Sequence, residues 1–132
     1  MNYLLDTHTF IWAFSEPEKL SSKAREVITN ANNAIFVSAI TFWEFALKFS
    51  INKLEVEGVT PVELPGIAIK MGFQLIQLSP EEGASSYNLS LTTHKDPFDR
   101  ILIWQAIKRD YILISKDGRM NEYISDGLKI FW

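Results

Sequence analysis

Short apolar segments alternate along this chain with longer segments whose apolar residues recur at helical spacing. The short segments are rich in β-branched and aromatic residues, and they span Tyr3–Leu5, Ala34–Val37, Phe73–Leu78 and Tyr111–Ile114. A final run, Leu128–Trp132, could add an edge strand. Because strands separated by helices usually pair in parallel, the alternation predicts a three-layer α/β/α fold with a central, mainly parallel sheet of four to five strands.

Length and composition predict a single domain that spans residues 1–132. The chain has 132 residues, of which 47% are apolar, enough for one cooperative core. Its longest apolar stretch, 34–51, is interrupted by Glu44 and Lys48, so we expect no membrane span. The first residues, MNYLLDTH, show no basic segment before an apolar one, so no secretory signal is visible and a cytoplasmic location is expected.

Composition also excludes several functional classes. The chain has no cysteine, which removes disulfides, thiolate metal sites and thiol catalysis. Neither a G-x-S-x-G motif nor a glycine-rich phosphate loop is present, which argues against a hydrolase triad, an NTPase and a dinucleotide enzyme. The net charge of −3 argues against a broad cationic surface for nucleic acid, although local basic contacts remain compatible with it.

Polar residues followed by proline or by a helical pattern mark the expected helix starts. These candidate caps are Ser21 or Ser22, Thr60 before Pro61, Ser79 before Pro80 and Asp96 before Pro97. The last of them opens the clearest helix, which runs through Trp104 and Ile107.

Four acidic residues fall where strand-like runs give way to a turn or a helix. Asp6 and Asp117 follow the first and fourth runs, Glu44 is expected one or two turns into the helix after the second run, and Asp99 in the first turn of its own helix. In an open parallel sheet, ligands bind beyond the carboxyl ends of the strands, so we expect all four acids to face one pocket. Such carboxylates repel one another unless a proton or a cation compensates them. Without cysteine, this ligand set is oxygen-based and suits Mg²⁺ or Mn²⁺.

Each acid also has a purely structural explanation. Asp6 can cap a helix over 7–14, Asp117-Gly118 is a turn signal, and Asp96 is a natural N-cap beside an Asp99 that the helix dipole favours. A parallel sheet gathers its helix N-termini at one edge, so capping alone would also collect acids there.

Glu44 is the acid that a structural explanation accommodates least well. Thr41 and Glu44 match a capping box, but Ser38 directly follows the strand and is the more natural cap. A helix that begins after Ser38 places Glu44 among apolar residues, where a carboxylate without a partner is costly. Lys48 at i+4 would contribute only ~0.2–0.5 kcal/mol on an exposed face, so a metal is the stronger partner.

The two histidines, His8 and His94, lack the spacing of a histidine metal site. We therefore expect them at the surface or supporting the acids indirectly, rather than as ligands.

Taken together, the acids and their sequence context resemble the PIN-domain ribonucleases, specifically the small VapC-type toxins of bacterial toxin–antitoxin pairs. The resemblance covers nearly the whole chain, and it is carried by LLDTHTFIW, VSAITFWEFALK, HKDPFDRILIWQA and LISKDGRM. The HKDPFDR stretch is the most specific of these motifs.

The resemblance implies a PIN-like fold and a Mg²⁺- or Mn²⁺-dependent endoribonuclease that acts as a toxin. It implies that the catalytic and metal-binding acids are Asp6, Glu44, Asp99 and Asp117. Asp96 is either a further ligand or only a helix cap. Thr7 and Ser115 match hydroxyls that accompany the acids, and the residues considered for substrate contact are Arg100, Lys48 and Lys116. The implied partners are an RNA substrate, a second copy of the chain and a small antitoxin that blocks the site.

Two other functions remain open at this point. A non-catalytic PIN-like module would keep its acids as helix caps and only bind a protein partner. A phosphatase of the haloacid-dehalogenase type also begins with a strand-ending aspartate, but Asp6 is not followed by a second aspartate two residues later.

Overall fold

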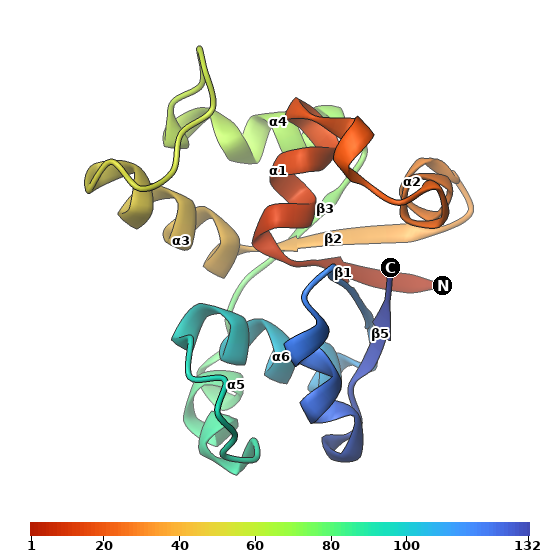
Figure 1. The fold of residues 1–132 in the computed structure, drawn as a ribbon, viewed down its shortest axis with the longest axis vertical. Helices are drawn as coiled ribbons and strands as arrows, with labels where there is room; N and C mark the ends of the chain where they lie inside the picture. Colours follow the sequence, from red (N-terminus) through yellow and green to blue (C-terminus); the bar gives the residue numbers. More distant parts are fainter.

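The computed structural model describes residues 1–132, and a five-stranded parallel sheet forms its centre (Figure 1). The strands are β1 (Asn2–Leu5), β2 (Ala34–Ser38), β3 (Gln74–Ile76), β4 (Ile112–Ile114) and β5 (Lys129–Phe131). They lie in the order β3-β2-β1-β4-β5, and every neighbouring pair is parallel. The predicted α/β fold is therefore confirmed, with a sheet that is entirely rather than mainly parallel, and the last apolar run forms the expected edge strand.

The third strand is shorter than the predicted segment 73–78. The backbone N–H of Phe73 closes the end of the preceding helix by donating to the Ala68 carbonyl at 3.0 Å. At the other end, the Gln77 carbonyl accepts hydrogen bonds from the side chains of Gln105 and Arg109. Both residues thus bond outside the sheet, which leaves only Gln74–Ile76 in the ladder.

Helices cover both faces of the sheet. The α-helices are α1 (Thr7–Ser15), α2 (Ser22–Thr29), α3 (Ala39–Ser50), α4 (Leu64–Lys70), α5 (Pro80–Ser85) and α6 (Pro97–Arg109). The 3₁₀ segments are η1 (Pro17–Lys19), η2 (Pro61–Glu63), η3 (Ser86–Asn88) and η4 (Gly118–Asp126). Figure 1 shows α1, α2 and α4 on one side of the sheet and α5 and α6 on the other. None of these helices combines the length and the apolarity that crossing a membrane would require.

Most of the predicted caps are present. The Ser21 hydroxyl accepts from the Ala24 N–H at 2.9 Å, and Ser79 forms a capping box with Glu82. Asp96 caps α6 by accepting from the Asp99 N–H at 3.0 Å. Thr60 is the N-cap of the 3₁₀ turn η2, with a capping box to Glu63 and Pro61 directly after it, and this turn leads into α4.

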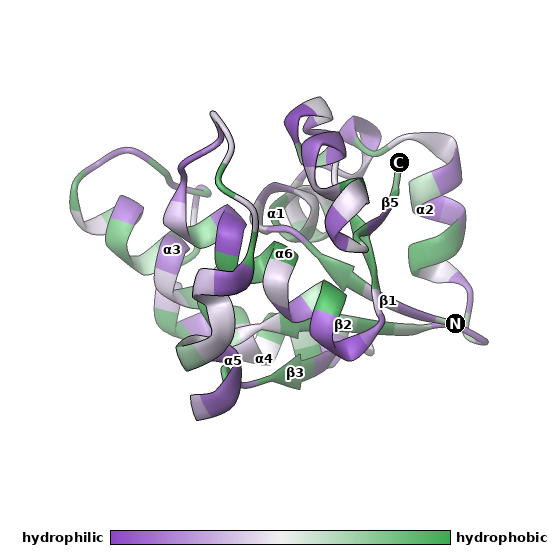
Figure 2. Ribbon diagram, turned by 90° about the horizontal axis from the view of Figure 1, so that it is seen from below, coloured by the Kyte–Doolittle hydropathy of each residue, from purple (hydrophilic) through white to green (hydrophobic).

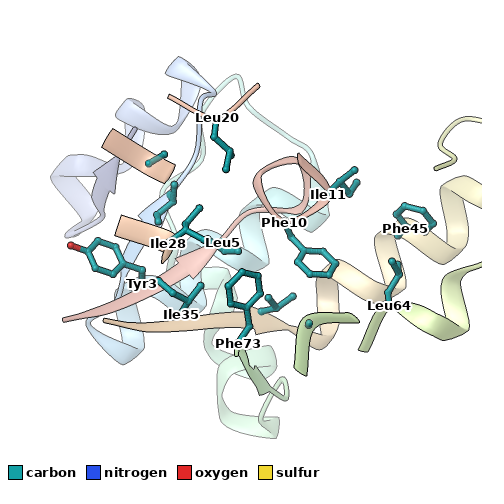
Figure 3. Packing of buried hydrophobic residues seen from close by; sticks show 14 residues of the cluster. Tyr3, Leu5, Phe10, Ile11, Leu20, Ile28, Ile35, Phe45, Leu64 and Phe73 are labelled. Atoms are coloured by element: carbon teal, nitrogen blue, oxygen red, sulfur yellow. The ribbon is translucent and has the colours of Figure 1, made fainter. Parts of the chain in front are cut away.

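Alternating strand residues build one apolar core on each face. Tyr3 and Leu5 of β1 point into the first core, which Phe10 and other buried residues of α1–α4 complete (Figure 3). Leu4 points to the opposite face, where Leu102 of α6 is buried. Figure 2 shows the hydrophobic residues concentrated on the strands. With both faces covered, the carboxyl edge of the sheet is where chain segments diverge and a ligand can bind.

Candidate active site

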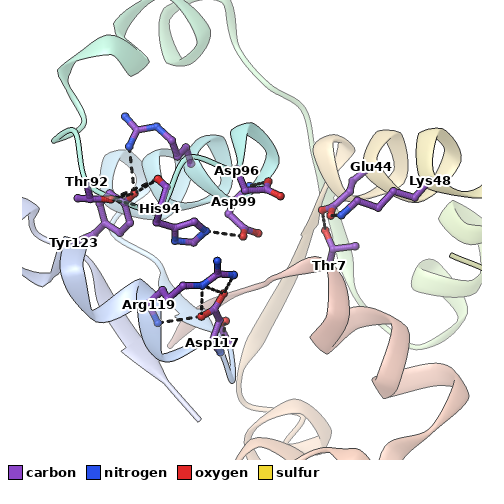
Figure 4. A network of polar contacts seen from close by, with 12 residues as sticks. Thr7, Glu44, Lys48, Thr92, His94, Asp96, Asp99, Asp117, Arg119 and Tyr123 are labelled. Atoms are coloured by element: carbon purple, nitrogen blue, oxygen red, sulfur yellow. Dashed lines mark hydrogen bonds and ion pairs between the residues drawn. The ribbon is translucent and has the colours of Figure 1, made fainter. Parts of the chain in front are cut away.

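A pocket of about 390 Å³ lies at the carboxyl edge of the sheet. It is lined by Asp6, His8, Trp12, Glu44, Lys48, Asp96, Asp99, Lys116, Asp117 and Arg119. The structure thus brings together the four acids singled out in the sequence, and Asp96 with them. Figure 4 shows their side chains converging from α3, from α6 and from the turn that follows β4.

Asp6 ends β1 and begins α1. Its carboxylate accepts a hydrogen bond from the Thr9 N–H at 2.9 Å, so it serves as the N-cap that one structural explanation expects. Burial raises the pKa of Asp6, while the Ser115 hydroxyl and Thr9 oppose the shift by hydrogen bonding. Asp6 takes part in none of the ion pairs with lysine or arginine.

Asp96 and Asp99 occupy the first turn of α6. Asp96 caps the helix, and Asp99 Oδ2 lies 2.9 Å from Nε2 of His94. Burial raises the pKa of Asp99 to about 6; the hydrogen bond with His94 opposes this shift, and the negative charges of Asp96, Glu44 and Asp6 reinforce it. The Asp99 carboxylate is therefore surrounded by like charge.

Glu44 lies one and a half turns into α3, which begins after Ser38 as the apolar pattern indicates. Only 2% of Glu44 is exposed. Its carboxylate accepts a hydrogen bond from the Thr7 hydroxyl at 2.6 Å and forms an ion pair with Lys48 (Figure 4). Thr7 thus lies beside an acid, as the family resemblance implies.

Lys48 is a stronger partner than an exposed i,i+4 lysine would be. The expectation that Lys48 contributes little assumed a solvated helix face, whereas α3 packs against α6 and partly buries this pair. Burial alone would lower the pKa of Lys48, but the hydrogen bond and the charge of Glu44 outweigh it, so the pKa is raised. The structure corrects the sequence interpretation here, because a cation of the chain itself compensates Glu44.

Asp117 follows β4 and precedes η4. Its carboxylate accepts from the Arg119 N–H at 3.0 Å and pairs with the Arg119 guanidinium at 2.8 Å. The hydrogen bond from Arg119 lowers the pKa of Asp117. The buried Ser115 hydroxyl accepts from the Asp117 N–H at 3.1 Å and so shapes this turn.

The charges of the pocket do not balance. Five carboxylates face three side-chain cations, an excess of two negative charges. Lys48 is paired with Glu44 and Arg119 with Asp117, while the Lys116 ammonium lies over the Trp12 ring, 5.9 Å from its centroid. No lysine or arginine side chain is paired with Asp6, Asp96 or Asp99; their hydrogen-bond partners are the Thr9 N–H, the Asp99 N–H and the His94 ring. A set of hard oxygen donors with surplus negative charge fits Mg²⁺ or Mn²⁺.

His94 supports Asp99 indirectly, which is one of the two places expected for it: its ring is buried, and Nε2 lies 2.9 Å from Asp99 Oδ2. One ligand atom from each of His94, Asp99 and Asp117 lies within 4.8 Å of the others. The guanidinium of Arg100 does not line the pocket; it donates to the Leu89 and Ser90 carbonyls and to the Tyr123 hydroxyl. Arg119 was not singled out, although its position two residues after Asp117, across a turn signal, favours such a pair.

Comparisons with known proteins identify relatives of this chain in sequence and in fold. Ribonuclease VapC22 of Mycobacterium tuberculosis (strain ATCC 25618 / H37Rv) is 27% identical over 120 residues, which cover 91% of this chain and 90% of that protein. The fold is similar to the crystal structure of VapBC2 from Rickettsia felis bound to a promoter DNA fragment, with a TM-score of 0.71 at 17% identity, covering 99% of this chain and 98% of the other.

DNA-bound VapBC from Salmonella typhimurium gives a TM-score of 0.70 at 16% identity, covering 99% of this chain and 97% of the other. The sequence pattern of the PIN domain matches residues 3–124. This chain, with its parallel sheet and its acidic carboxyl edge, therefore belongs to the PIN-domain family.

Proposed function

We propose that this protein is a Mg²⁺- or Mn²⁺-dependent endoribonuclease that acts in the cytoplasm as the toxin of a toxin–antitoxin pair. The observation that carries the proposal is the surplus of negative charge around Asp6, Asp96 and Asp99 at the edge of a PIN-domain sheet. Similarity to a protein named a ribonuclease supports the choice of RNA as the substrate.

The proposed metal-binding acids are Asp6, Glu44, Asp99 and Asp117, with Asp96 either a further ligand or only the cap of α6. A divalent cation held there would promote attack of water on the phosphodiester bond and stabilise the charge that develops on the leaving oxygen. Thr7 holds the Glu44 carboxylate, and Ser115 shapes the turn that carries Asp117. These hydroxyls keep the acids pointed at one pocket.

Positive side chains at the same pocket supply the contacts that an RNA phosphate needs. Lys48, Lys116 and Arg119 line it, which allows an acidic protein to attract a polyanion locally. A bound divalent cation would further reverse the sign of the charge that the carboxylates present. Arg100 is unsuited to this role, since its guanidinium is engaged in holding the loop before α6.

The primary test replaces single acids by their neutral amides. Asp6→Asn and Asp99→Asn should each abolish Mg²⁺-dependent RNA cleavage, because each removes a carboxylate from the pocket and keeps the shape of the side chain. Asp110→Asn is the matched control: Asp110 is exposed, lies outside the pocket and adopts a left-handed backbone conformation that asparagine tolerates. Circular dichroism would verify the fold of each variant, and undiminished cleavage by both site variants would overturn the assignment.

The partners of this chain follow from the same proposal. The similar structures are VapBC complexes, and we propose that this chain likewise forms a homodimer and is inhibited by a small antitoxin. The test is to express the product of a short neighbouring reading frame and add it to the cleavage assay. A toxin predicts loss of cleavage at about equimolar antitoxin, and an unaffected rate would contradict this part of the proposal.

A non-catalytic binding module is the second candidate function. It is favoured by the structural roles that the acids already have, since Asp6, Asp96 and Asp117 are caps and Glu44 is ion-paired. Isothermal titration with Mn²⁺ separates the candidates, because a module whose acids are only structural would not bind the ion. Membership of the PIN family removes the haloacid-dehalogenase alternative.

A further inference from the structure

His94 is a buried titratable side chain in contact with an acid of the pocket, and the proposed chemistry assigns it no part. Its ring is fully buried, and Nε2 lies 2.9 Å from Asp99 Oδ2. The other ring nitrogen, Nδ1, is buried and has no hydrogen-bond partner. An imidazole with one engaged and one orphaned nitrogen makes a single directed contact with the protein, and that contact is to Asp99.

The contact fixes the tautomer of the ring. An ionised carboxylate only accepts hydrogen bonds, so Nε2 must carry the hydrogen that it donates to Asp99. The ring is therefore oriented so that Nε2 faces Asp99 Oδ2, while Nδ1 makes no bond. This single hydrogen bond orients Asp99, whereas Lys48 and Arg119 form ion pairs with Glu44 and Asp117.

A second set of hydrogen bonds fixes the backbone of His94 (Figure 4). The hydroxyl of Tyr123, a fully buried residue of η4, donates to the His94 carbonyl at 2.9 Å. The His94 N–H donates to the Thr92 hydroxyl at 3.0 Å, and that hydroxyl lies 2.8 Å from the Tyr123 hydroxyl. Arg100 also donates to the Tyr123 hydroxyl, at 3.2 Å. The loop before α6 is thus held at both the backbone and the ring.

We propose that His94 is a positioning residue for the metal centre: its ring fixes the Asp99 carboxylate through Oδ2, and Tyr123 fixes His94. The proposal rests on the function proposed above. Hydrogen bonds to the carboxylates of a metal site orient them, and removing such a bond typically costs about 10–100-fold in metal affinity or activity. The role belongs to one nitrogen of the ring, so it can be tested by substitutions that replace one nitrogen position at a time.

The test compares three substitutions of His94 by Mn²⁺ titration calorimetry and RNA cleavage with the full chain. His94→Gln places an amide N–H near the position of Nε2, so it should retain wild-type Mn²⁺ affinity within a few-fold. His94→Asn reaches only the position of Nδ1, which has no partner here, and His94→Leu donates nothing. Both should weaken Mn²⁺ binding by about 10–100-fold.

Two further variants control for damage to the loop. Thr93→Ala alters the neighbouring residue, whose exposed hydroxyl contacts Glu122 at 3.3 Å, and should leave Mn²⁺ affinity unchanged. Tyr123→Phe removes the hydroxyl that holds the His94 carbonyl but keeps the imidazole, so it should give a smaller loss than His94→Leu. If His94→Leu does not fold, the difference between the Gln and Asn variants still decides the role of Nε2.

The outcomes separate this proposal from the assigned function. If the wild-type chain neither binds Mn²⁺ nor cleaves RNA, the metal centre is wrong and the positioning role fails with it. If the wild type binds and cleaves but His94→Leu does so equally well, only the positioning role is overturned. Equal weakening by the Gln and Asn variants would mean that the ring is needed for packing rather than for its hydrogen bond to Asp99.

Discussion

Two acids that packing removes largely from solvent, Glu82 of α5 and Asp99 of α6, differ in what compensates them. Glu82 of α5 accepts two hydrogen bonds from Arg109, at 2.6 and 3.0 Å, and others from the Ser79 N–H and Gln105. Burial alone would raise the pKa of Glu82, but these bonds and the charge of Arg109 hold it at about 2. Asp99 receives one side-chain hydrogen bond, from the His94 ring, and burial together with the neighbouring acids raises its pKa to about 6.

The difference shows which acids the fold itself requires. An acid that stabilises the native state is given a cation and several donors, as Glu82 is. The pocket acids Asp6, Asp96 and Asp99 are paired with no lysine or arginine, so their mutual repulsion is retained in the folded protein. An arrangement that costs stability in the absence of a ligand is typical of a functional site.

The largest effect should come from removing the cation that compensates Glu82. Arg109→Leu leaves a buried carboxylate unpaired and should destabilise the protein by about 3 kcal/mol, measured by urea unfolding. Lys129→Met is the matched control, because Lys129 pairs with the exposed Asp110 and should change stability by no more than about 0.5 kcal/mol. Similar losses in both variants would show that burial of Glu82 has no special importance.

Neutral amides at the two acids should have effects of opposite sign. In metal-free protein at pH 7, Glu82→Gln should destabilise by about 2 kcal/mol, because it discards the interactions that favour the ionised form. Asp99→Asn should instead stabilise by about 1 kcal/mol, because it removes a charge that burial and neighbouring acids disfavour. Urea unfolding in the presence of EDTA measures both changes.

The pH dependence follows from the direction of each pKa shift. The pKa of Glu82 is lowered from ~4.3 in the unfolded chain to about 2 in the folded protein. Its contribution to the free energy of unfolding is therefore complete above pH ~4.3 and is lost as the pH falls toward 2. The pKa of Asp99 is raised from ~3.9 in the unfolded chain to about 6 in the folded protein. The destabilisation that the ionised Asp99 causes is therefore absent below pH ~3.9 and complete above about pH 6. The gain from Asp99→Asn should therefore vanish near pH 4. A loss of stability in both amide variants at pH 7 would favour a structural role for the pocket acids.

The sequence predicts the fold well because its signals are local. Short apolar runs identify the strands. Caps such as Ser21, Ser79 and Asp96 mark helix starts, and each binds a backbone N–H only three residues further along the chain. The convergence of the acids follows from the parallel sheet, which collects strand ends at one edge. The end of the third strand was less predictable, because side chains of α6 capture the carbonyl of Gln77.

Which cation or hydrogen-bond donor pairs with each acid was less predictable from the sequence, because this pairing depends on packing between segments that are distant in sequence. Thr7 and Glu44 are 37 residues apart, and the Lys48 ammonium lies over the ring of Phe98 in α6. The His94 carbonyl is likewise held by the hydroxyl of Tyr123, which lies 29 residues further along the chain. Sequence spacing identifies which groups carry charge, but not which of them the folded protein neutralises.

Lys48 provides the finest test of the comparison, with the smallest expected effect. Lys48→Met removes the cation paired with Glu44 and adds one uncompensated carboxylate to the pocket. Because Lys48 and a divalent ion would compete for the same carboxylate, Mn²⁺ should bind the variant several-fold more tightly, a gain of about 1 kcal/mol. Titration calorimetry measures this change directly.

Lys48→Met also distinguishes the acidic pocket from the surroundings of Glu82. Only in the pocket should a bound metal ion be able to replace the positive charge that a substitution removes. Saturating Mn²⁺ should restore more stability to Lys48→Met than to wild type, because an ion that binds only the native state stabilises it according to its affinity. Arg109→Leu should gain no more than wild type, since Glu82 lies outside the pocket. If Mn²⁺ binds Lys48→Met no more tightly than wild type, Glu44 is a structural partner of Lys48 and leaves the proposed ligand set, which then consists of aspartates alone.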